Sequence, residues 1–292
     1  MKKSLFLVLI IFSSFLLSQQ SLKSNLESII KDKNATIGVS VWNLEKGEKT
    51  SVNGDSNLPM MSVFKLHIAM TILDLVDGGT LKLNQKIKFS KSELMQNTWS
   101  PMRDKYPNGG DIPLSEMIKY VVAQSDNNTC DILLNKIGGL KTVENYIHKI
   151  GVTDFWAVAN EKMMHKVDGA IYKNLTTANA SNLLLTKLYT ESVLKKNSKD
   201  FLIKIMEETS TGAKRLKGNL PENTVVAHKT GTSGADKKGK TAATNDIGVI
   251  SLPNSEHLVI SVFVTDSFEN DQTNEKIIAD VAKASFDYYN KK

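Results

Sequence analysis

The feature that most constrains the fold is the distribution of strand-like segments, which lie near the two ends of the chain and leave a helical middle between them. Residues 35–44, ATIGVSVWNL, alternate in the manner of a half-buried strand, and the turn-like pair Lys46-Gly47 leads into a second short strand. Three more strand-like runs follow near the other end, at 224–231, 246–253 and 257–265. We therefore expect one antiparallel sheet built from both chain ends.

Between these strands the apolar residues recur at helical spacing. The segments with this pattern are 62–77, 114–124, 128–137, 140–150 and 176–190, and the flanking segments 21–33 and 271–290 share it. These patterns predict an α/β (α+β) fold, in which an antiparallel sheet with flanking helices carries an inserted all-helical subdomain. The α/β part would comprise about 20–60 and 211–292, and the helical part about 61–210. A cleft between them is the expected place for a site.

The first residues have the pattern of a signal peptide. Lys2 and Lys3 precede the apolar stretch 5–17, and Ser18 offers a small residue for cleavage, although Leu16 departs from the small-x-small rule. We expect a signal peptide at 1–19, a single domain at 20–292, no membrane anchor after cleavage, and a secreted or periplasmic protein. A monomer is the default expectation.

Composition excludes several other classes of protein. Removal of the two signal-peptide lysines lowers the formal net charge from +6 to +4, and the mature chain lacks a Lys/Arg cluster interleaved with aromatic residues, which argues against nucleic-acid binding. The single cysteine, Cys130, cannot form an intramolecular disulfide and is expected in the core. The five histidines are scattered without metal-ligand spacing, so we expect neither a metal nor a cofactor.

One candidate for the chemistry is the segment Ser62-Val63-Phe64-Lys65. A serine and a lysine three positions apart on a helix share a face, so the lysine can reach and activate the hydroxyl. Backbone N–H groups in the first helical turn favour developing negative charge. The spacing alone is weak, because Ser28 with Lys31 and Ser192 with Lys195 also have it.

Two further polar motifs follow along the chain. Ser125-Asp126-Asn127 comes directly after a predicted helix, and Lys229-Thr230-Gly231-Thr232 lies on a predicted strand. Taken alone, the first is typical of a loop or a helix cap. Gly231 removes a side chain from its strand, which suits the close approach of a ligand.

In this order, S-x-x-K, S-D-N and K-T-G resemble the signature set of penicillin-binding proteins and class A β-lactamases. The resemblance extends from the hairpin near residue 36 to the terminal helix. Glu161 occupies the position, between S-D-N and K-T-G, of the glutamate that class A β-lactamases carry in an Ω-shaped loop and transpeptidases generally lack. The chain is thus similar to enzymes that hydrolyse the β-lactam ring of penicillins and cephalosporins and confer antibiotic resistance.

The resemblance implies a role for each motif residue. Ser62 would attack the lactam carbonyl, with Lys65, or Glu161 through a water, as the base. Ser125, assisted by Lys229, would pass a proton to the lactam nitrogen, and Glu161 would activate the deacylating water. The implied oxyanion hole consists of the N–H groups of Ser62 and Thr232. The implied substrate-binding residues are Asn127, Thr230, Gly231, Thr232, Arg215, Trp99 and His165.

For three of these residues the sequence leaves a second, purely structural role open. His165 replaces an asparagine common in the family and resembles a PER/VEB-like extended-spectrum subgroup, where it would contact the hydrolytic water; it could also be a packed loop histidine. Arg215 resembles an arginine that assists carboxylate binding, or it lies on the surface. Trp99 flanks the entrance or serves local packing.

Two other functions use the same serine and lysine. One is a penicillin-binding D,D-peptidase that acts on cell-wall peptides, and the other is a sensor domain that binds the drug and holds it. Glu161 argues against both, because it stands at the family spacing of the class A glutamate, which transpeptidases generally lack.

Overall fold

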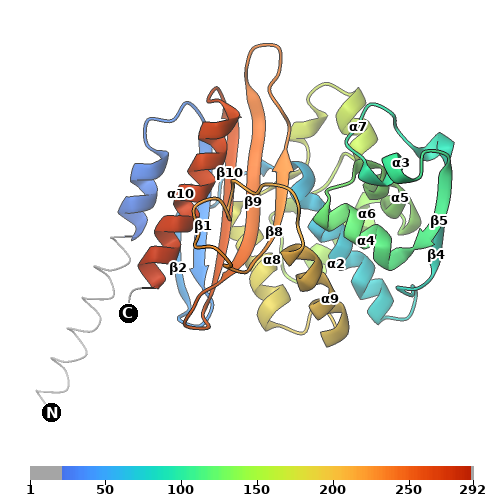
Figure 1. The fold of residues 1–292 in the computed structure, drawn as a ribbon, viewed down its shortest axis with the longest axis horizontal. Helices are drawn as coiled ribbons and strands as arrows, with labels where there is room; N and C mark the ends of the chain where they lie inside the picture. The colour runs from blue at the N-terminus through green and yellow to red at the C-terminus, as the bar shows by residue number, and fades with distance from the viewer. Residues whose placement is uncertain (1–21, 291–292) are drawn as a thin grey trace, which may run out of the picture.

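A five-stranded antiparallel sheet runs through the middle of the protein and separates two layers of helices (Figure 1). The computed structural model describes residues 22–290, so the predicted signal peptide at 1–19 lies outside the described residues. The strand order is β2-β1-β10-β9-β8. The strands are β1 (Thr36–Asn43), β2 (Glu48–Val52), β8 (Val226–Thr232), β9 (Thr241–Ser251) and β10 (His257–Ser267). The predicted sheet from both chain ends is confirmed.

Strand β1 shows how sequence alternation places the sheet between two cores. Ile37, Val39 and Val41 point to one face and join a core formed with the helix at 22–30 and with α10 (Asp271–Tyr289). Trp42 points to the opposite face, where a second and larger core lies. Both faces of the sheet are therefore covered, as the nearly continuous burial of β1 requires.

The larger core is built around α2 (Phe64–Asp77), whose first ten residues are all buried. A helix that is buried all round needs neighbours on every side, and α2 packs against α4, α5, α6 and α9. The helices of this layer are α3 (Pro101–Lys105), α4 (Leu114–Ala123), α5 (Asn127–Lys136), α6 (Leu140–Lys149), α7 (Glu161–Lys166), α8 (Ala178–Thr190) and α9 (Lys196–Glu207). Cys130 on α5 is fully buried, as expected. None of the described helices is both long and apolar enough to span a bilayer.

Small strands inside the helical region were not predicted. β4 (Lys86–Ser90) pairs with β5 (Gly109–Pro113), and a second small sheet joins β3 (Leu58–Pro59), β7 (Leu175–Thr176) and β6 (Phe155–Trp156). Three of these strands have only two residues, and β5 reads GGDIP, so neither alternation nor β propensity marks these four. β4 reads KIKFS and does alternate, with Ile87 and Phe89 buried, but its five residues were not recognised as a strand.

A buried polar network attaches α8 to the sheet. The Nδ2 of Asn182 donates to Ser40 Oγ at 2.9 Å and to the Val259 carbonyl at 3.1 Å, while Ser261 Oγ donates to Asn182 Oδ1 at 2.6 Å. Both amide ends of Asn182 are thus used, so its burial leaves no polar group of that side chain unpaired.

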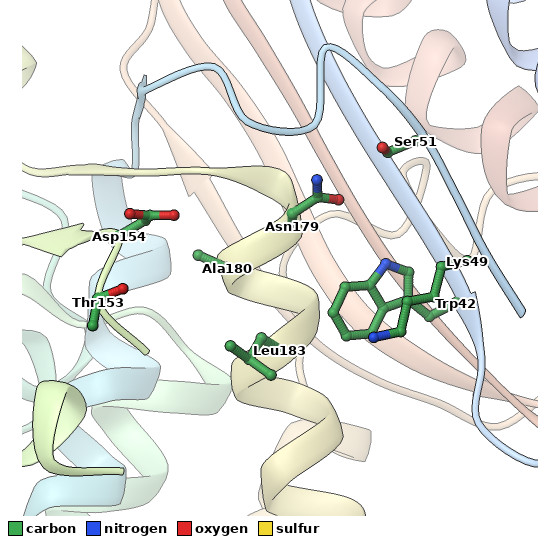
Figure 2. A pocket seen from close by; sticks show the side chains of 8 residues that line it. All are labelled: Trp42, Lys49, Ser51, Thr153, Asp154, Asn179, Ala180 and Leu183. Carbon is green, nitrogen blue, oxygen red and sulfur yellow. The ribbon is translucent and has the colours of Figure 1, made fainter. Parts of the chain in front are cut away.

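Beside this network, α8 borders a surface pocket of about 260 Å³ (Figure 2). Asn179, Ala180 and Leu183 of α8 line its middle, and the ammonium of Lys49 stands 3.8 Å from the centre of the Trp42 ring at one side. The ammonium contacts the indole face in the geometry of a cation–π pair, which leaves Trp42 only 8% exposed.

Candidate active site

The predicted site residues converge on a cavity of about 230 Å³ between β8 and the helical layer. It is lined by Ser62, Trp99, Ser125, Asn127, Thr211, Gly212, Arg215, Thr230 and Thr232. Seven of these nine were expected from the sequence, and Thr211 and Gly212 are additional. The cleft expected between the sheet and the helical part is therefore present.

Ser62 lies in a short 3-10 turn, η1 (Met61–Val63), that leads directly into α2. We expected it in the first turn of the α-helix itself. The preceding residue, Met61, has a φ of 45°, a left-handed conformation that non-glycine residues rarely adopt. Such strain is held by surrounding structure and is typical of functional turns.

Gly231 allows β8 to lie directly against this turn. A Cβ at Gly231 would overlap the carbonyl oxygen of Met60 and would lie 3.3 Å from both Met61 Cβ and Val63 Cγ2. From the sequence, we expected this glycine to allow the close approach of a ligand; in the structure it allows the close approach of the segment that carries Ser62. The missing side chain therefore sets the distance between β8 and the Ser62 turn.

Lys65 is fully buried one helical turn after Ser62, and three oxygen atoms surround its ammonium group. It donates to the Ser125 carbonyl at 2.8 Å and, through a short hydrogen bond, to Asn127 Oδ1. It also forms an ion pair with Glu161 Oε1 at 2.9 Å. Lys65 thus connects the S-D-N motif with the predicted glutamate.

Glu161 is the first residue of α7, and the residue is 4% exposed. The carboxylate of Asp131 on α5 accepts the backbone N–H groups of Glu161 at 2.9 Å and of Lys162 at 3.0 Å. Burial raises the pKa of Asp131, and these two N–H donors oppose the rise. Asp131 thereby fixes the start of α7, and with it Glu161, against α5.

Ser125 follows α4 with a φ of 56°, a second left-handed residue in the site. Its hydroxyl accepts a hydrogen bond of 2.9 Å from Lys229 Nζ, which also donates to the Thr230 carbonyl at 2.9 Å. Burial holds the pKa of Lys229 well below its usual range, the charge of Lys65 lowers it further, and Asp246 and Glu161 oppose these effects.

Arg215 is 6% exposed, which excludes the surface alternative. Its guanidinium donates to the Gly231 carbonyl at 3.2 Å, to the Asn245 carbonyl at 3.0 Å and to Thr232 Oγ1 at 2.8 Å. From the other side Glu275 of α10 contacts it at 3.3 Å. Arg215 therefore lines the cavity and at the same time supports the end of β8.

His165 and Trp99 lie at the rim. Trp99 is 61% exposed and donates from Nε1 to the Gln124 carbonyl at 2.8 Å. His165 Nε2 lies 2.8 Å from Thr98 Oγ1, which accepts a 2.6 Å hydrogen bond from Asn127 Nδ2. The described contact of His165 therefore leads through Thr98 to Asn127.

Sequence reasoning missed several residues that support the site. Asn174 is fully buried; its Oδ1 accepts the N–H groups of Val158 and Ala159 at 2.8 Å, and its Nδ2 donates to the Ala159 carbonyl at 2.6 Å. Asp131, Thr98 and Asn174 each look like an ordinary helix or loop residue in the sequence, and no local pattern marks their contacts. Residues 22–290 contain no group of three or more His, Cys, Asp or Glu side chains that could hold a metal ion.

In this arrangement the buried ammonium group of Lys65 pairs with the buried Glu161 carboxylate, and that of Lys229 donates to the Ser125 hydroxyl. Both pairs lie beside the cavity that Ser62 lines. A hydroxyl near a lysine and a carboxylate can be deprotonated, and a second lysine–serine pair can deliver a proton to a leaving group. The site therefore suits acyl transfer to Ser62.

Comparison with known proteins agrees with this chemistry. The model of the beta-lactamase enzyme family matches residues 21–289. Beta-lactamase VEB-1 of Pseudomonas aeruginosa is 43% identical over 99% of this chain and 98% of its own length, and the extended-spectrum beta-lactamase PER-1 of the same organism is 45% identical over 98% and 94%. The crystal structure of the TLA-3 extended-spectrum beta-lactamase superposes with a TM-score of 0.92 at 48% identity, over 94% of this chain and all of the other. The chain belongs to the beta-lactamase enzyme family as a class A member, and it is a hydrolase of the β-lactam ring.

Proposed function

We propose that the β-lactam ring is opened by Ser62 and that the resulting acyl-enzyme is hydrolysed with the help of Glu161. The observation that carries the proposal is the continuous set of contacts from Glu161 through Lys65 to Ser125 and Lys229 beside the cavity that Ser62 lines. Acyl transfer needs a nucleophile, a base and a proton donor; Ser62 is the nucleophile, and the residues of this set supply the base and the proton donor.

In the acylation step, Ser62 Oγ attacks the lactam carbonyl carbon and loses its proton. Lys65 accepts it directly, or Glu161 accepts it through a water. The C–N bond of the ring then breaks, and Ser125 passes its proton to the nitrogen while Lys229, 2.9 Å away, replaces it. The N–H groups of Ser62 and Thr232 hold the oxyanion, where one such donor contributes about 3–4 kcal/mol.

In the deacylation step, the Glu161 carboxylate removes a proton from a water that attacks the ester carbon on Ser62. The bond from that carbon to Ser62 Oγ then breaks, and the proton passes from Glu161 back to the Ser62 oxygen. Asp131 fixes the backbone from which Glu161 projects. His165 contributes at the rim by holding Thr98 and hence Asn127, in addition to the water contact expected from the sequence.

The substrate carboxylate is bound by the cationic end of β8. Lys229, Thr230 and Thr232 face it, and Arg215 holds Thr232 Oγ1 at 2.8 Å. Gly231 keeps this strand against the Ser62 turn. On the other wall, Asn127 binds the acylamido side chain and Trp99 flanks the entrance.

The experiment follows turnover of a chromogenic cephalosporin by the mature protein, with Glu161→Ala and a chelator control alongside. We expect many turnovers that the chelator leaves unchanged, and a variant that stalls as a covalent adduct on Ser62. One stoichiometric burst without further turnover by the wild type would instead indicate the peptidase or the sensor.

The substrate range extends to extended-spectrum cephalosporins. Support comes from His165 and from the similarity to PER-1 and TLA-3, which are named extended-spectrum enzymes. Good cleavage of simple penicillins with no turnover of oxyimino-cephalosporins would refute this part.

The mature protein, residues 20–292, acts as an exported monomer of one domain without a membrane anchor. Support comes from the charged and apolar pattern of residues 1–19. Mass spectrometry of protein from the extracytoplasmic fraction checks the new N-terminus, and light scattering checks the mass; an uncleaved chain or a dimer would contradict the proposal.

A further inference from the structure

The loop that precedes α3 carries two groups of the candidate site. This segment, residues 95–99, is called the entrance loop; it lies between the short 3-10 turn η2 (Lys91–Glu93) and α3 and forms neither helix nor strand. Trp99 lines the cavity, and Thr98 Oγ1 accepts the hydrogen bond of Asn127 Nδ2. The carbonyl groups of an irregular loop have no partners in a helix or a sheet, so their donors must come from elsewhere in the molecule or from water.

Three carbonyl groups of the entrance loop converge on one side chain, that of Arg103 in α3. Its guanidinium nitrogen Nη1 donates to the carbonyl oxygens of Met95 at 3.0 Å, of Gln96 at 2.6 Å and of Thr98 at 2.9 Å. Carbonyl oxygens that point at one centre repel one another, and a permanent cation between them stabilises the arrangement. The Arg103 side chain is 16% exposed, so these contacts are largely shielded from water. The entrance loop is therefore folded around this guanidinium.

The two ends of the entrance loop have other supports, but its middle has not. At the first residue, Asn128 of α5 accepts the Met95 N–H on Oδ1 at 2.7 Å and donates from Nδ2 to the Met95 carbonyl at 3.1 Å. At the last residue, the Trp99 carbonyl accepts the backbone N–H of Asn127 at 3.1 Å. Among residues 22–290, the carbonyl groups at positions 96 and 98 have no donor other than Arg103. Arg103 therefore controls the part of the loop in which Thr98 lies.

An unbroken series of contacts leads from Arg103 into the site. Arg103 binds the Thr98 carbonyl, and the Thr98 hydroxyl accepts the 2.6 Å hydrogen bond from Asn127 Nδ2. At the other end of the same amide, Asn127 Oδ1 accepts the hydrogen bond of Lys65. Because one partner holds each end, the direction of the Asn127 amide beside the cavity depends on both. Movement of Thr98 would release one of these two ends.

We propose that Arg103 is a positioning residue for β-lactam recognition: by binding the carbonyl groups of the entrance loop, it holds Thr98 against Asn127 and so fixes the amide that receives the acylamido side chain of the substrate. This inference rests on the role proposed above for Asn127. Only two of the 37 basic residues are arginines, Arg103 and Arg215, and each uses its guanidinium to bind backbone carbonyl groups beside the cavity. A forked cation is thus present on both walls.

The test compares two penicillins that differ only in the acyl group, benzylpenicillin and 6-aminopenicillanic acid, which lacks it. The quantity followed is the acyl preference, defined as the ratio of kcat/KM for benzylpenicillin to kcat/KM for 6-aminopenicillanic acid. Arg103→Met and Arg103→Gln remove the cation, and Arg103→Lys keeps a charge without the fork. Asp104→Asn is the matched control, because it breaks the ion pair of Arg103 and leaves the carbonyl contacts in place. Melting temperatures are recorded for every variant.

We expect Arg103→Met and Arg103→Gln to lower the acyl preference about fivefold, the size typical of one weakened hydrogen bond. The change comes from a higher KM for benzylpenicillin, while kcat/KM for 6-aminopenicillanic acid stays within about twofold of wild type, because that substrate has no acyl group for Asn127 to bind. Arg103→Lys recovers part of the preference. Asp104→Asn keeps the wild-type values, since an exposed ion pair contributes little.

Three results would overturn the inference. One is an unchanged acyl preference in Arg103→Met and Arg103→Gln, because the entrance loop then holds Thr98 without the cation. Another is an equal loss of kcat/KM for both penicillins, which would assign Arg103 a purely structural role. The third is failure of both variants to fold while Arg103→Lys folds, since the cation is then needed for the fold rather than for Asn127.

Asn127→Ala separates this inference from the proposed mechanism. If Asn127→Ala keeps the wild-type acyl preference, the role proposed for Asn127 is wrong. If Asn127→Ala lowers the acyl preference and the Arg103 variants do not, only the inference about Arg103 fails.

Discussion

Acid should destabilise this protein through one buried histidine on the central helix. His67 is fully buried on α2, its ring stacks on Phe155 with centroids 4.3 Å apart, and neither ring nitrogen has a hydrogen-bond partner among residues 22–290. Burial lowers the pKa of His67 from 6.5 to about 3, against a small opposing effect of the Val63 carbonyl. The folded protein therefore keeps this ring neutral at mildly acidic pH.

The size of the effect follows from linkage. Above pH 6.5 the ring is neutral in both states and contributes nothing; below it the unfolded chain binds a proton that the folded chain does not, so stability falls until pH 3. At about 1.36 kcal/mol per unit, the loss is about 2.7 kcal/mol at pH 4.5 and about 5 kcal/mol below pH 3. That is a large part of a typical folding free energy.

Urea denaturation at pH 7.5 and pH 4.5 measures this loss in the wild type and in His67→Phe, which keeps a planar ring but cannot titrate. We expect the wild type to lose about 2.7 kcal/mol more than His67→Phe between the two pH values. Phe155→Leu disturbs the same packing without removing the titrating ring, so it should keep the wild-type pH dependence. Parallel losses in the wild type and His67→Phe would refute the reasoning.

Three further substitutions test the site and its support. Gly231→Ala should destabilise by about 1–3 kcal/mol in urea denaturation and lower kcat/KM, because the new methyl group overlaps the Met60 carbonyl; a fully active, equally stable variant would contradict this. Asn182→Ala should cost about 2–4 kcal/mol, since the buried Ser261 hydroxyl loses its acceptor, and kcat/KM at 25 °C should stay unchanged. Arg215→Ala should raise KM for anionic β-lactams about tenfold, and Arg215→Lys should not restore it, because one ammonium cannot replace the forked set of donors; equal KM values in all three proteins would show that Arg215 does not act on the substrate wall.

The sheet was predictable because its strands carry strong alternation or β-branched residues. The sequence of β9 explains a boundary error: it begins at Thr241, five residues before the predicted run, and its first residues, TAATN, include weak strand formers. Pairing with β8 on one side and β10 on the other imposes the strand there. The strand propensity of residues 241–245 does not reveal that they will pair with β8 and β10.

The motif residues were predictable because each belongs to a short signature motif, and the motifs follow one another in the order typical of the family. The residues that hold them were not. Asp131 reads as a polar position in the middle of a helix, and Thr98 reads as an ordinary loop residue. Their importance comes from contacts with Glu161 and Asn127, which lie far away along the chain. A single sequence contains no sign of such long-range hydrogen bonds.

The strand order also governs when the protein can fold. β1 emerges early in synthesis, but its neighbour β10 is near the C-terminus, and Asn43 at the end of β1 bonds Glu256, 213 residues later. The central pairing must therefore wait until nearly the whole chain has been made. Such late closure gives a high contact order and slow folding. For the exported protein proposed above, late closure would keep the polypeptide unfolded during passage across the membrane, and the Ser62 turn, which β8 and β9 support, would form only afterwards.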